Sequence, residues 1–447
     1  MFNKILIANR AEIACRIART CRRLGIASVA IYSEADEGSP HTDQADEAYC
    51  VGPGPVSESY LNGEKIIEVA KRTGCDALHP GYGLLSENAQ FIAAVESAGL
   101  TFIGPQPATV ELMGDKQRAR SFARECDVPI VPGSDELTDD QSAIEFAEAI
   151  GYPVLVKAAA GGGGIGMKVA KKEKALIKAL AECRRRGESA FGSAKVYLER
   201  YISKPRHIEI QVLADKHGKA IHLFERECSI QRRHQKVVEE APSVLMSKHP
   251  GLRERMTAAA LALTRQANYL NAGTVEFIVD ETGQFYFIEM NTRLQVEHPV
   301  TELITGLDLV ALQIEIAAGH PLSLSQEDVS MTGHAIECRV YAEDPEKLFL
   351  PAPGKIGRYR EPDNVRVDSG VRANWDVVSF YDPMIAKLSA HGASRQAAID
   401  EMLKALAGYQ IEGLTNNLSM HDRVLRSTAF HEGDFDTLWL EGFMKDG

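Results

Sequence analysis

FYFIEMNTRLQVEH, residues Phe285 to His298, alternates polar and apolar residues almost without a break. Successive side chains of a β-strand point to opposite faces, so the pattern predicts a strand with one polar and one apolar face. The polar face would carry Glu289, Asn291, Arg293, Gln295 and Glu297, and the other face Tyr286, Ile288, Met290, Leu294 and Val296. The polar row offers oxygen ligands for a hard cation, then a guanidinium, an amide and another carboxylate. We expect a small-anion site beside Mg2+, although a solvated strand face would give the same alternation.

Size and composition limit the classes of function. The chain has 447 residues, a length that predicts about three domains with ample core. Its 50 Lys and Arg against 62 Asp and Glu give a net charge of -12, which argues against nucleic-acid or anionic-membrane partners. Glu12 interrupts the start before any signal-peptide apolar region, so we expect a cytoplasmic protein. Its cysteines lack C-x-x-C spacing, and so predict neither a zinc nor a redox site.

The N-terminal segment alternates strands with a helix. We predict strands over Lys4–Ala8 and Ile26–Tyr32 and a helix over Ala11–Leu24, a pattern typical of a parallel, doubly wound sheet. The turn ANRAEIA lacks the glycines of a dinucleotide-binding loop, so NAD binding is not expected. HPGYGLLSEN, from His79 to Asn88, predicts a loop beyond a strand end, where substrates often bind; an ordinary turn is an equally good interpretation.

A compact unit in the middle of the chain resembles a mobile lid. It contains a helix near Gln141–Ile150, a strand Pro153–Ala158, a glycine loop Gly161–Gly166, a strand Met167–Ala170 and a charged helix Lys172–Arg186. Backbone N–H groups of a glycine loop suit phosphate oxygens, and Lys157 just before it could neutralise them. The loop is not a Walker A motif, because Met167 follows its last glycine. We favour a phosphate-covering flap over a flexible linker.

Several further residues could carry chemistry. If the strands holding Glu276 and Glu289 are neighbours, these carboxylates and Asn291 form an oxygen cage for one or two Mg2+ ions on ATP phosphates. His207, Glu209 and Gln211 alternate in RHIEIQ and should share one strand face. Other polar residues could also belong to a site, but a solvated surface explains them equally simply: the basic run Ser229–Glu240, Lys116, and Glu199–Tyr201. For Glu337 and Arg339, which share a strand face, the simple alternative to a functional role is a structural ion pair.

Taken in order, the motifs IANRAEIA, HPGYG, LMGDK, KAAAGGGGIGM, RHIEIQ, QRRHQKVVEEAP, FIEMNTRLQVEHPVTE, HAIECR and YDPMIAKL resemble biotin carboxylase, of the ATP-grasp superfamily. The resemblance runs over essentially the whole chain. It implies mixed α/β and α+β structure in three parts: a doubly wound parallel-sheet domain at 1–113, an ATP-grasp domain at 114–330 with a mobile glycine-rich lid at about 131–202, and an α+β domain at 331–447. It also implies a homodimer.

The same resemblance implies a role for each matching residue. ATP would be bound by Lys116, Lys157, Gly163, Gly164, Glu199, Arg200, Tyr201, Ile202, His207, Gln231 and His234. Mg2+ or Mn2+ would be held by Glu276, Glu289 and Asn291. Bicarbonate would lie against Lys236, Arg293, Gln295 and the backbone of Val296, with Glu297 as the base. Biotin would be received by Arg339 and by the loop at Tyr82 and Gly83.

Departures from the family pattern leave parts of the function open. Ala11 replaces a usual glycine, and Ile165 occupies a lid position that is often basic. No Ala-Met-Lys-Met sequence is present, so biotin should arrive on a separate carrier protein, with a carboxyltransferase subunit as a further partner, unless the chain is a fragment. We expect an acyl-CoA acceptor, as in acetyl-CoA carboxylase. The alternatives are another acceptor such as urea, another ATP-grasp ligase, or a nucleotide-sensing scaffold.

Overall fold

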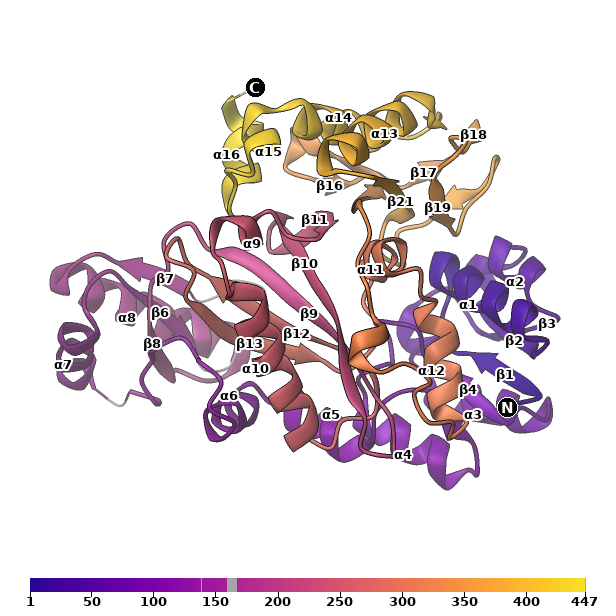
Figure 1. The fold of residues 1–447 in the computed structure, drawn as a ribbon, viewed down its shortest axis with the longest axis horizontal. Helices are drawn as coiled ribbons and strands as arrows, with labels where there is room; N and C mark the ends of the chain where they lie inside the picture. The colour runs from indigo at the N-terminus through magenta and orange to yellow at the C-terminus, as the bar shows by residue number, and fades with distance from the viewer. Residues whose placement is uncertain (138, 159–166, 447) are drawn as a thin grey trace.

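The computed structural model describes residues 1–137, 139–158 and 167–446, and it begins with a five-stranded parallel sheet in the order β3-β2-β1-β4-β5 (Figure 1). Its strands are β1 (Lys4–Ile7), β2 (Ala27–Ser33), β3 (Glu47–Gly52), β4 (Ala77–His79) and β5 (Thr101–Phe102). The helices between them are α1 (Ala11–Leu24), α2 (Pro40–Gln44), α3 (Gly63–Arg72) and α4 (Ala89–Ser97), and α5 (Pro107–Gly114) follows β5. The predicted doubly wound sheet is confirmed.

The alternation of β1 explains how this sheet is covered. Ile5 and Ile7 belong to a core cluster shared with α1 and with a helix from later in the chain, α12 (Leu309–Ala317). Leu6 belongs to a second cluster, shared with α3 and α4. Because neighbouring side chains of a strand point to opposite faces, one short apolar strand holds helices on both sides of the sheet.

The lid predicted from the sequence is a small antiparallel sheet with two helices. The sheet has the order β7-β6-β8, and its elements are β6 (Val154–Ala158), β7 (Met167–Ala170), β8 (Val196–Arg200), α7 (Asp140–Ile150) and α8 (Glu173–Phe191). The unit projects at the left of Figure 1. Gly163, Gly164 and Ile165, for which the sequence predicts nucleotide contacts, lie outside the described residues.

An eight-stranded sheet joins the centre of the chain to its C-terminal part, in the order β13-β12-β9-β10-β11-β14-β21-β19. Its strands are β9 (Arg206–Ala214), β10 (Ala220–Arg232), β11 (Gln235–Ala241), β12 (Asn271–Val279), β13 (Phe285–Asn291), β14 (His334–Tyr341), β19 (Arg366–Ser369) and β21 (Met384–Gly392). The pairing of β11 with β14 carries the sheet across the boundary expected near Ser330. Residues far apart in the sequence therefore share one rigid surface.

Helices and short strands complete the structure. The remaining helices are α6 (Lys116–Glu125), α9 (Leu245–Lys248), α10 (Leu252–Gln266), α11 (His298–Thr305), α13 (Arg395–Gly408), α14 (Leu418–Arg426), α15 (Thr428–Glu432) and α16 (Trp439–Asp446). The remaining strands form two-residue pairs: β15 (Glu343–Asp344) with β16 (Leu350–Pro351), β17 (Gly354–Lys355) with β20 (Asp376–Val377), and β18 (Tyr359–Arg360) with β22 (Gln410–Ile411).

The prediction of one strand from Phe285 to His298 is wrong at its end. β13 stops at Asn291, residues 292–297 form an irregular turn, and α11 begins at His298. The chain turns because Leu294 is fully buried in the cluster that joins the N-terminal sheet to α12. Arg293, Gln295 and Glu297 therefore lie on a turn rather than on a strand face.

The predicted faces of β13 are confirmed from Glu289 to Asn291 but are wrong for Tyr286 and Ile288, because the strand contains a bulge. Glu289 pairs with Glu276 on β12, but Phe287 pairs with the next residue, Phe277, so Ile288 is an extra residue in the ladder. A bulge shifts the alternation of side chains by one position. As a result Phe285, Phe287 and Met290 are buried together in one core cluster, whereas Glu289 and Asn291 line a cleft.

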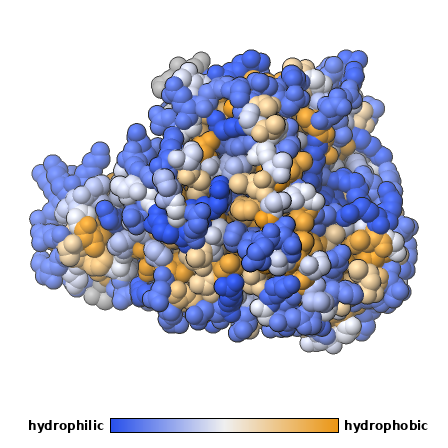
Figure 2. All heavy atoms as spheres, viewed as in Figure 1, coloured by the Kyte–Doolittle hydropathy of each residue, from blue (hydrophilic) through white to orange (hydrophobic). Residues whose placement is uncertain are grey.

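The visible surface is mainly hydrophilic. Figure 2 shows hydrophobic residues on this face in separate groups rather than in one continuous patch. In the described part of the chain, no helix is both long enough and apolar enough to cross a membrane.

The aromatic cluster behind the bulge should be important for stability. Phe277 is fully buried, and its ring centroid lies 5.4 Å from that of Phe285 and 6.4 Å from that of Phe287. We expect Phe277→Ala to lower the free energy of unfolding by about 3–5 kcal/mol, because it leaves a cavity against both rings. The half-exposed Phe380 is the matched control, and Phe380→Ala should cost about 1 kcal/mol or less. Urea unfolding measures both, and equal losses would contradict the assignment of the core.

Candidate active site

A cleft of about 820 Å3 lies between the lid and the large sheet. The lid contributes Lys157 and Glu199, the strands β12 and β13 contribute Glu276 and Glu289, and the end of the chain contributes Leu438. Of the residues that the sequence predicts for ATP, metal and bicarbonate, all those in the described ranges line this cleft except Glu297, which is fully buried behind it. Residues from very different parts of the sequence are thus brought to one cavity.

Lys236 on β11 binds carboxylates from three separate elements. Its Nζ atom donates to Glu209 on β9 at 2.6 Å, to Glu276 on β12 at 2.6 Å and to Glu297 before α11 at 2.7 Å. Burial alone would lower the pKa of Lys236, but these carboxylates raise it well above its ordinary value. The ammonium group is therefore charged at any physiological pH, and all three of its hydrogens are used.

Glu297 is held by two cations. Besides Lys236, its second carboxylate oxygen accepts from Arg339 on β14 at 3.0 Å, and Arg339 also donates to Glu239 at 2.6 Å. Although burial would raise the pKa of Glu297, the charges of Lys236, Arg339 and Arg226 hold it well below its usual range. Glu297 is thus an ionised acceptor next to two donors that could also hold an anion.

Oxygen donors gather where β9, β12 and β13 run side by side. Glu276 is in register with Glu289 on β13, so the strands of the predicted oxygen cage are neighbours, and on its other side Glu276 is in register with Glu209. Asn291 donates its amide N–H to Glu276 at 2.7 Å, and His207 Nε2 lies 2.8 Å from the same carboxylate. Burial, and then the charge of Glu276, raise the pKa of Glu289. Two carboxylates and an amide oxygen fit Mg2+ or Mn2+.

A second donor set overlaps the predicted one. Among the described residues, ligand atoms of His207, Glu209 and Glu276 lie within 4.8 Å of one another. Glu209 was not predicted as a site residue, although its alternation with His207 in RHIEIQ could have indicated it. Because Lys236 bonds both Glu209 and Glu276, this side of the cage is already neutralised by a protein cation.

Arg293 connects the turn after β13 to the N-terminal part of the chain. It donates to Glu87 at 2.8 Å, to Gln295 at 2.8 Å and to Asn291 at 2.9 Å. Gln295 in turn donates to Glu276 at 2.9 Å. Glu87 lies in the HPGYGLLSEN loop, so this loop supports the guanidinium group from a distant domain. The guanidinium plane is thereby fixed beside the metal cage.

The far end of the cleft contains residues that the sequence predicts for ATP. Glu199 on β8 forms ion pairs with Lys157 on β6 and with Arg120 on α6. Lys116, Arg200, Tyr201, Ile202, Gln231 and His234 also line the cleft. Gln231 donates to His207 at 2.8 Å, which ties this end to the carboxylate cage. Thr437 and Leu438 line it too, and no sequence motif indicated them.

Of the three residues predicted to receive biotin, Arg339 lines the cleft and the other two lie elsewhere. Tyr82 and Gly83 are not among the residues that line the 820 Å3 cleft. The Tyr82 hydroxyl donates to Glu12 on α1, and its ring centroid lies 5.7 Å from the Nζ atom of Lys387. Their contact with biotin stays a prediction. Lys387 itself was missed, although an isolated lysine in the apolar strand MIAKLSAHG is an unusual residue.

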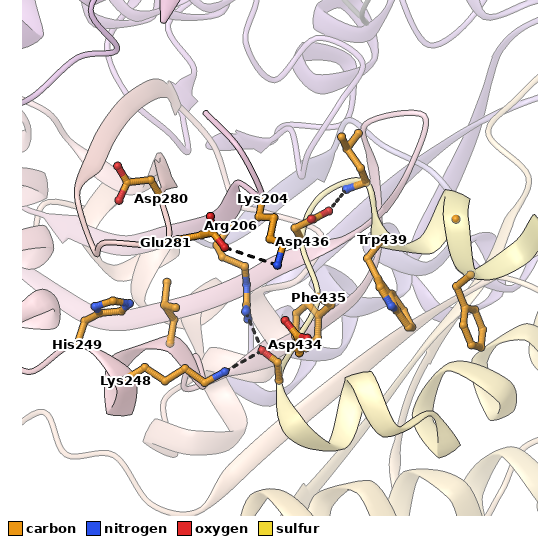
Figure 3. A pocket seen from close by; sticks show the side chains of 15 residues that line it. Lys204, Arg206, Lys248, His249, Asp280, Glu281, Asp434, Phe435, Asp436 and Trp439 are labelled. Carbon is orange, nitrogen blue, oxygen red and sulfur yellow. Dashed lines mark hydrogen bonds and ion pairs between the residues drawn. The ribbon is translucent and has the colours of Figure 1, made fainter. Parts of the chain in front are cut away.

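A separate cavity of about 630 Å3 shares the lining residue Leu438 with the cleft (Figure 3). Its basic groups support one loop: Arg206 and Lys248 donate to the carbonyl oxygen of Gly433 at 2.9 and 3.2 Å. Arg206 is also bound to Glu227 and stacks 4.1 Å from the ring centroid of Phe435. The loop leads directly to Leu438, which lines both cavities, so these contacts support the wall of the cleft.

Comparison with known families gives a consistent result along the chain. Residues 1–110 match the family described as "Biotin carboxylase, N-terminal domain", and residues 337–442 match "Biotin carboxylase C-terminal domain". Residues 115–325 match "Carbamoyl-phosphate synthase L chain, ATP binding domain". The three matches follow one another in the order expected from the motifs.

Individual relatives cover nearly the whole chain. It is 52% identical over 444 residues to Biotin carboxylase 2 of Bacillus subtilis, covering 99% of each protein. It is 49% identical over 451 residues to the mitochondrial propionyl-CoA carboxylase alpha chain of Mus musculus, covering 100% of this chain and 62% of that one.

A solved structure gives the same result in three dimensions. The biotin carboxylase domain dimer of Hydrogenobacter thermophilus 2-oxoglutarate carboxylase, in complex with MgADP, ADP and bicarbonate, has a TM-score of 0.92 to this structure at 47% identity. The similarity covers 99% of this chain and 98% of that one.

Replacing Lys236 should change how the stability of the fold depends on pH. In the wild type, the pKa of Glu276 and the pKa of Glu297 are both lowered in the folded state. These ionised carboxylates therefore stabilise the fold at neutral pH, and that stability is lost only as pH falls through the lowered pKa values. In Lys236→Met, Arg339 and Arg226 still lower the pKa of Glu297, but burial without the ammonium raises the pKa of Glu276. Glu276 then binds a proton in the folded state, so the variant gains stability as pH falls from about 8 to about 5.

Urea unfolding at several pH values measures this difference. At neutral pH the substitution should cost about 3–5 kcal/mol, because it leaves buried charges uncompensated. Lys347→Met, at a lysine whose side chain is 74% exposed, is the control and should have little effect. A Lys236→Met protein whose stability followed pH as the wild type does would contradict the assigned interactions.

Proposed function

Because this chain belongs to the biotin carboxylase family, we propose that it uses ATP and bicarbonate to carboxylate biotin. One observation carries the proposal: a single ammonium group, on Lys236, joins the carboxylates of a metal cage to the buried Glu297. Arg339 bonds the other side of Glu297. A continuous polar network therefore runs from the predicted phosphate site to the predicted biotin site, as a two-step carboxylation requires.

The nucleotide half of the reaction is assigned to the lid and to β12 and β13. Lys116, Lys157, Glu199, His207, Gln231 and His234 bind ATP, together with the hinge at Arg200, Tyr201 and Ile202. Glu276, Glu289 and Asn291 hold Mg2+ or Mn2+, which supplies positive charge against the phosphates when bound. Gly163 and Gly164, outside the described residues, are assigned to the lid contact with phosphate from their motif alone.

Bicarbonate is assigned to the turn between β13 and α11. Lys236, Arg293, Gln295 and the backbone of Val296 bind the anion, which takes the place that carboxylates now occupy around these cations. Glu297 accepts the bicarbonate proton, and the oxygen so exposed attacks the γ-phosphate of ATP, giving carboxyphosphate and ADP. The cations hold the anion in line with the phosphate, so catalysis rests mainly on positioning and charge neutralisation.

Biotin carboxylation follows at Arg339. Carboxyphosphate breaks down to CO2 and phosphate, and the phosphate takes the proton of the biotin ureido nitrogen. The buried guanidinium of Arg339 stabilises the negative charge that develops on the ureido oxygen, and the nitrogen attacks CO2 to form carboxybiotin. Tyr82 and Gly83 hold the biotin ring. Lid closure keeps water away from carboxyphosphate.

Membership of the family supports a proposal for the domains and partners. We propose domain limits of 1–113, 114–330 and 331–447, with the lid at about 131–202. A homodimer, a biotin carrier protein and a carboxyltransferase subunit complete the proposed assembly, and a cytoplasmic location goes with it. The dimer finds support in the related domain dimer of 2-oxoglutarate carboxylase.

The final acceptor differs among relatives of this chain. Their names include a propionyl-CoA carboxylase and a 2-oxoglutarate carboxylase at similar identity. We propose an acyl-CoA acceptor, on the strength of the propionyl-CoA relative. Carboxyl transfer assayed with acyl-CoA, pyruvate, 2-oxoglutarate and urea in the assembled enzyme distinguishes these acceptors.

ATP hydrolysis tests the proposed function directly. Hydrolysis should require Mg2+ and bicarbonate, and free biotin should accelerate it, because carboxyphosphate forms only from bicarbonate and is consumed by biotin. Phosphate release measured with each component omitted is the assay. Hydrolysis that neither needs bicarbonate nor responds to biotin would favour another ATP-grasp ligase.

Substitutions should separate the anion site from the nucleotide site. Arg293→Ala and Lys236→Ala are expected to lower bicarbonate-dependent hydrolysis by at least about 100-fold, the loss typical of removing a group that stabilises the transition state. MgADP affinity, measured by calorimetry, should change little. Arg358→Ala, at an arginine whose side chain is 65% exposed, is the control. Loss of MgADP binding in both site variants would contradict this division of roles.

A further inference from the structure

Lys387 is a fully buried lysine that contacts the proposed bicarbonate site from behind. It lies on β21, and its Nζ atom donates to the carbonyl oxygen of Val296 at 2.7 Å. A lysine is almost never buried completely unless its charge is paired, because removal of an ammonium group from water is costly. The ion pair is made with Glu12, whose Oε1 atom lies 3.3 Å away.

Lys387 is also a direct neighbour of Arg339. The two residues are cross-strand partners in the ladder of β14 with β21. Arg339 holds the side chain of Glu297, while Lys387 holds the carbonyl of the preceding residue, Val296. Two cations on adjacent strands thus fix two consecutive residues of the same turn. Like charges that lie opposite each other on neighbouring strands repel. The pair of Arg339 and Lys387 is therefore stable only because carboxylates surround the two cations.

Glu12 connects Lys387 to the loop proposed to receive biotin. The Tyr82 hydroxyl donates to Glu12 Oε1, and the Lys387 ammonium forms its ion pair with the same atom, while Glu12 Oε2 is buried with no hydrogen-bond partner among the described residues. The two groups therefore share one carboxylate oxygen. Because Lys387 is held by Glu12 on one side and by the carbonyl of Val296 on the other, we expect a movement of the Tyr82 hydroxyl to change the balance between these two contacts.

The surroundings of Glu12 leave little room for other adjustments. An added Cβ at Gly370, beside β19, would lie 2.5 Å from the backbone nitrogen of Glu12, so the C-terminal part of the chain packs directly on α1. Asn9 holds the Tyr82 loop by donating to the carbonyl oxygens of Pro80 and Tyr82 at 2.7 and 2.8 Å. Close packing transmits small displacements instead of absorbing them.

We propose that Glu12 and Lys387 are positioning residues that couple biotin at the Tyr82 loop to the bicarbonate-binding backbone at Val296. The proposal rests on the function proposed above, and it adds a physical link between the two half-sites. Biotin that contacts Tyr82 alters the bond from Tyr82 to Glu12, and the change passes through Lys387 to the turn that holds bicarbonate. Biotin would in this way accelerate the cleavage of ATP, a step in which it takes no chemical part.

Glu12→Gln tests the link. The amide removes the charge that attracts Lys387 but can still accept from Tyr82. Bicarbonate-dependent ATP hydrolysis is measured with and without saturating free biotin. We expect the stimulation by biotin to fall by about 5–150-fold, the usual range of coupling between sites, while the rate without biotin and the KM for ATP stay as in the wild type. A merely structural loss would lower both rates together and leave their ratio unchanged.

A matched control and a double-mutant cycle complete the design. Glu64 is an exposed glutamate in the first turn of α3, as Glu12 is a buried one in the first turn of α1, and Glu64→Gln should leave the stimulation unchanged. Tyr82→Phe removes the hydroxyl that bonds Glu12. If the link is real, Tyr82→Phe combined with Glu12→Gln loses little more stimulation than the stronger single variant. If Glu12→Gln does not fold, Glu12→Asp, which keeps the charge on a shorter side chain, should show a partial loss.

The outcomes separate this inference from the proposed function. If biotin stimulates the wild type and stimulates Glu12→Gln just as strongly, the link is overturned and the proposed function stands. Where Glu12→Asp replaces Glu12→Gln, the same result in Glu12→Asp has the same meaning. Losses in the single variants that multiply in the double variant would overturn it as well. A wild-type protein that biotin does not stimulate would overturn the proposed function and the link with it.

Discussion

The site depends on the bonds from one buried ammonium group to three carboxylates. Without Lys236, the charges of Glu209, Glu276 and Glu297 would face one another in a space that water hardly reaches, at a cost of several kcal/mol for each unpaired ion. Arg226 and Arg339 supply the remaining positive charge around Glu209 and Glu297. In the proposed mechanism, substrate anions and a divalent cation bind among these balanced charges, so their binding exchanges ionic partners and buries little new charge.

This balance requires the large sheet to be one continuous surface. The register of β9 with β12 and of β12 with β13 sets Glu209, Glu276 and Glu289 side by side, and the bulge at Ile288 turns Glu289 toward the cleft. The pairing of β11 with β14 then brings Arg339 into the same network from beyond the predicted domain boundary. The fold therefore joins the proposed phosphate site to Arg339 of the proposed biotin site through a sheet.

Local patterns predicted much of this structure. The helix Ala11–Leu24 and the parallel N-terminal sheet follow from periodicity alone, and the motifs named residues that do meet in one cleft. The prediction for the faces of β13 failed before Glu289 because a bulge leaves no clear mark in the alternation of polar and apolar residues. The prediction that the strand continues past Asn291 failed because Leu294, although apolar as the alternation required, is buried against a distant helix. Glu87 and Glu239 act through contacts distant in sequence, so no local pattern could assign their roles. The isolated lysine in MIAKLSAHG marks Lys387 as unusual, but its partner Val296 is likewise distant in sequence.

The central claim is that bicarbonate, held between Lys236, Arg293 and Glu297, attacks the γ-phosphate of ATP in one continuous site. Hydrolysis in the presence of bicarbonate labelled with heavy oxygen tests it most directly, with mass spectrometry of the phosphate released. The attacking oxygen stays on phosphorus when carboxyphosphate breaks down, so each phosphate should carry one labelled oxygen. Phosphate without label would mean that water attacks ATP, and would contradict the account.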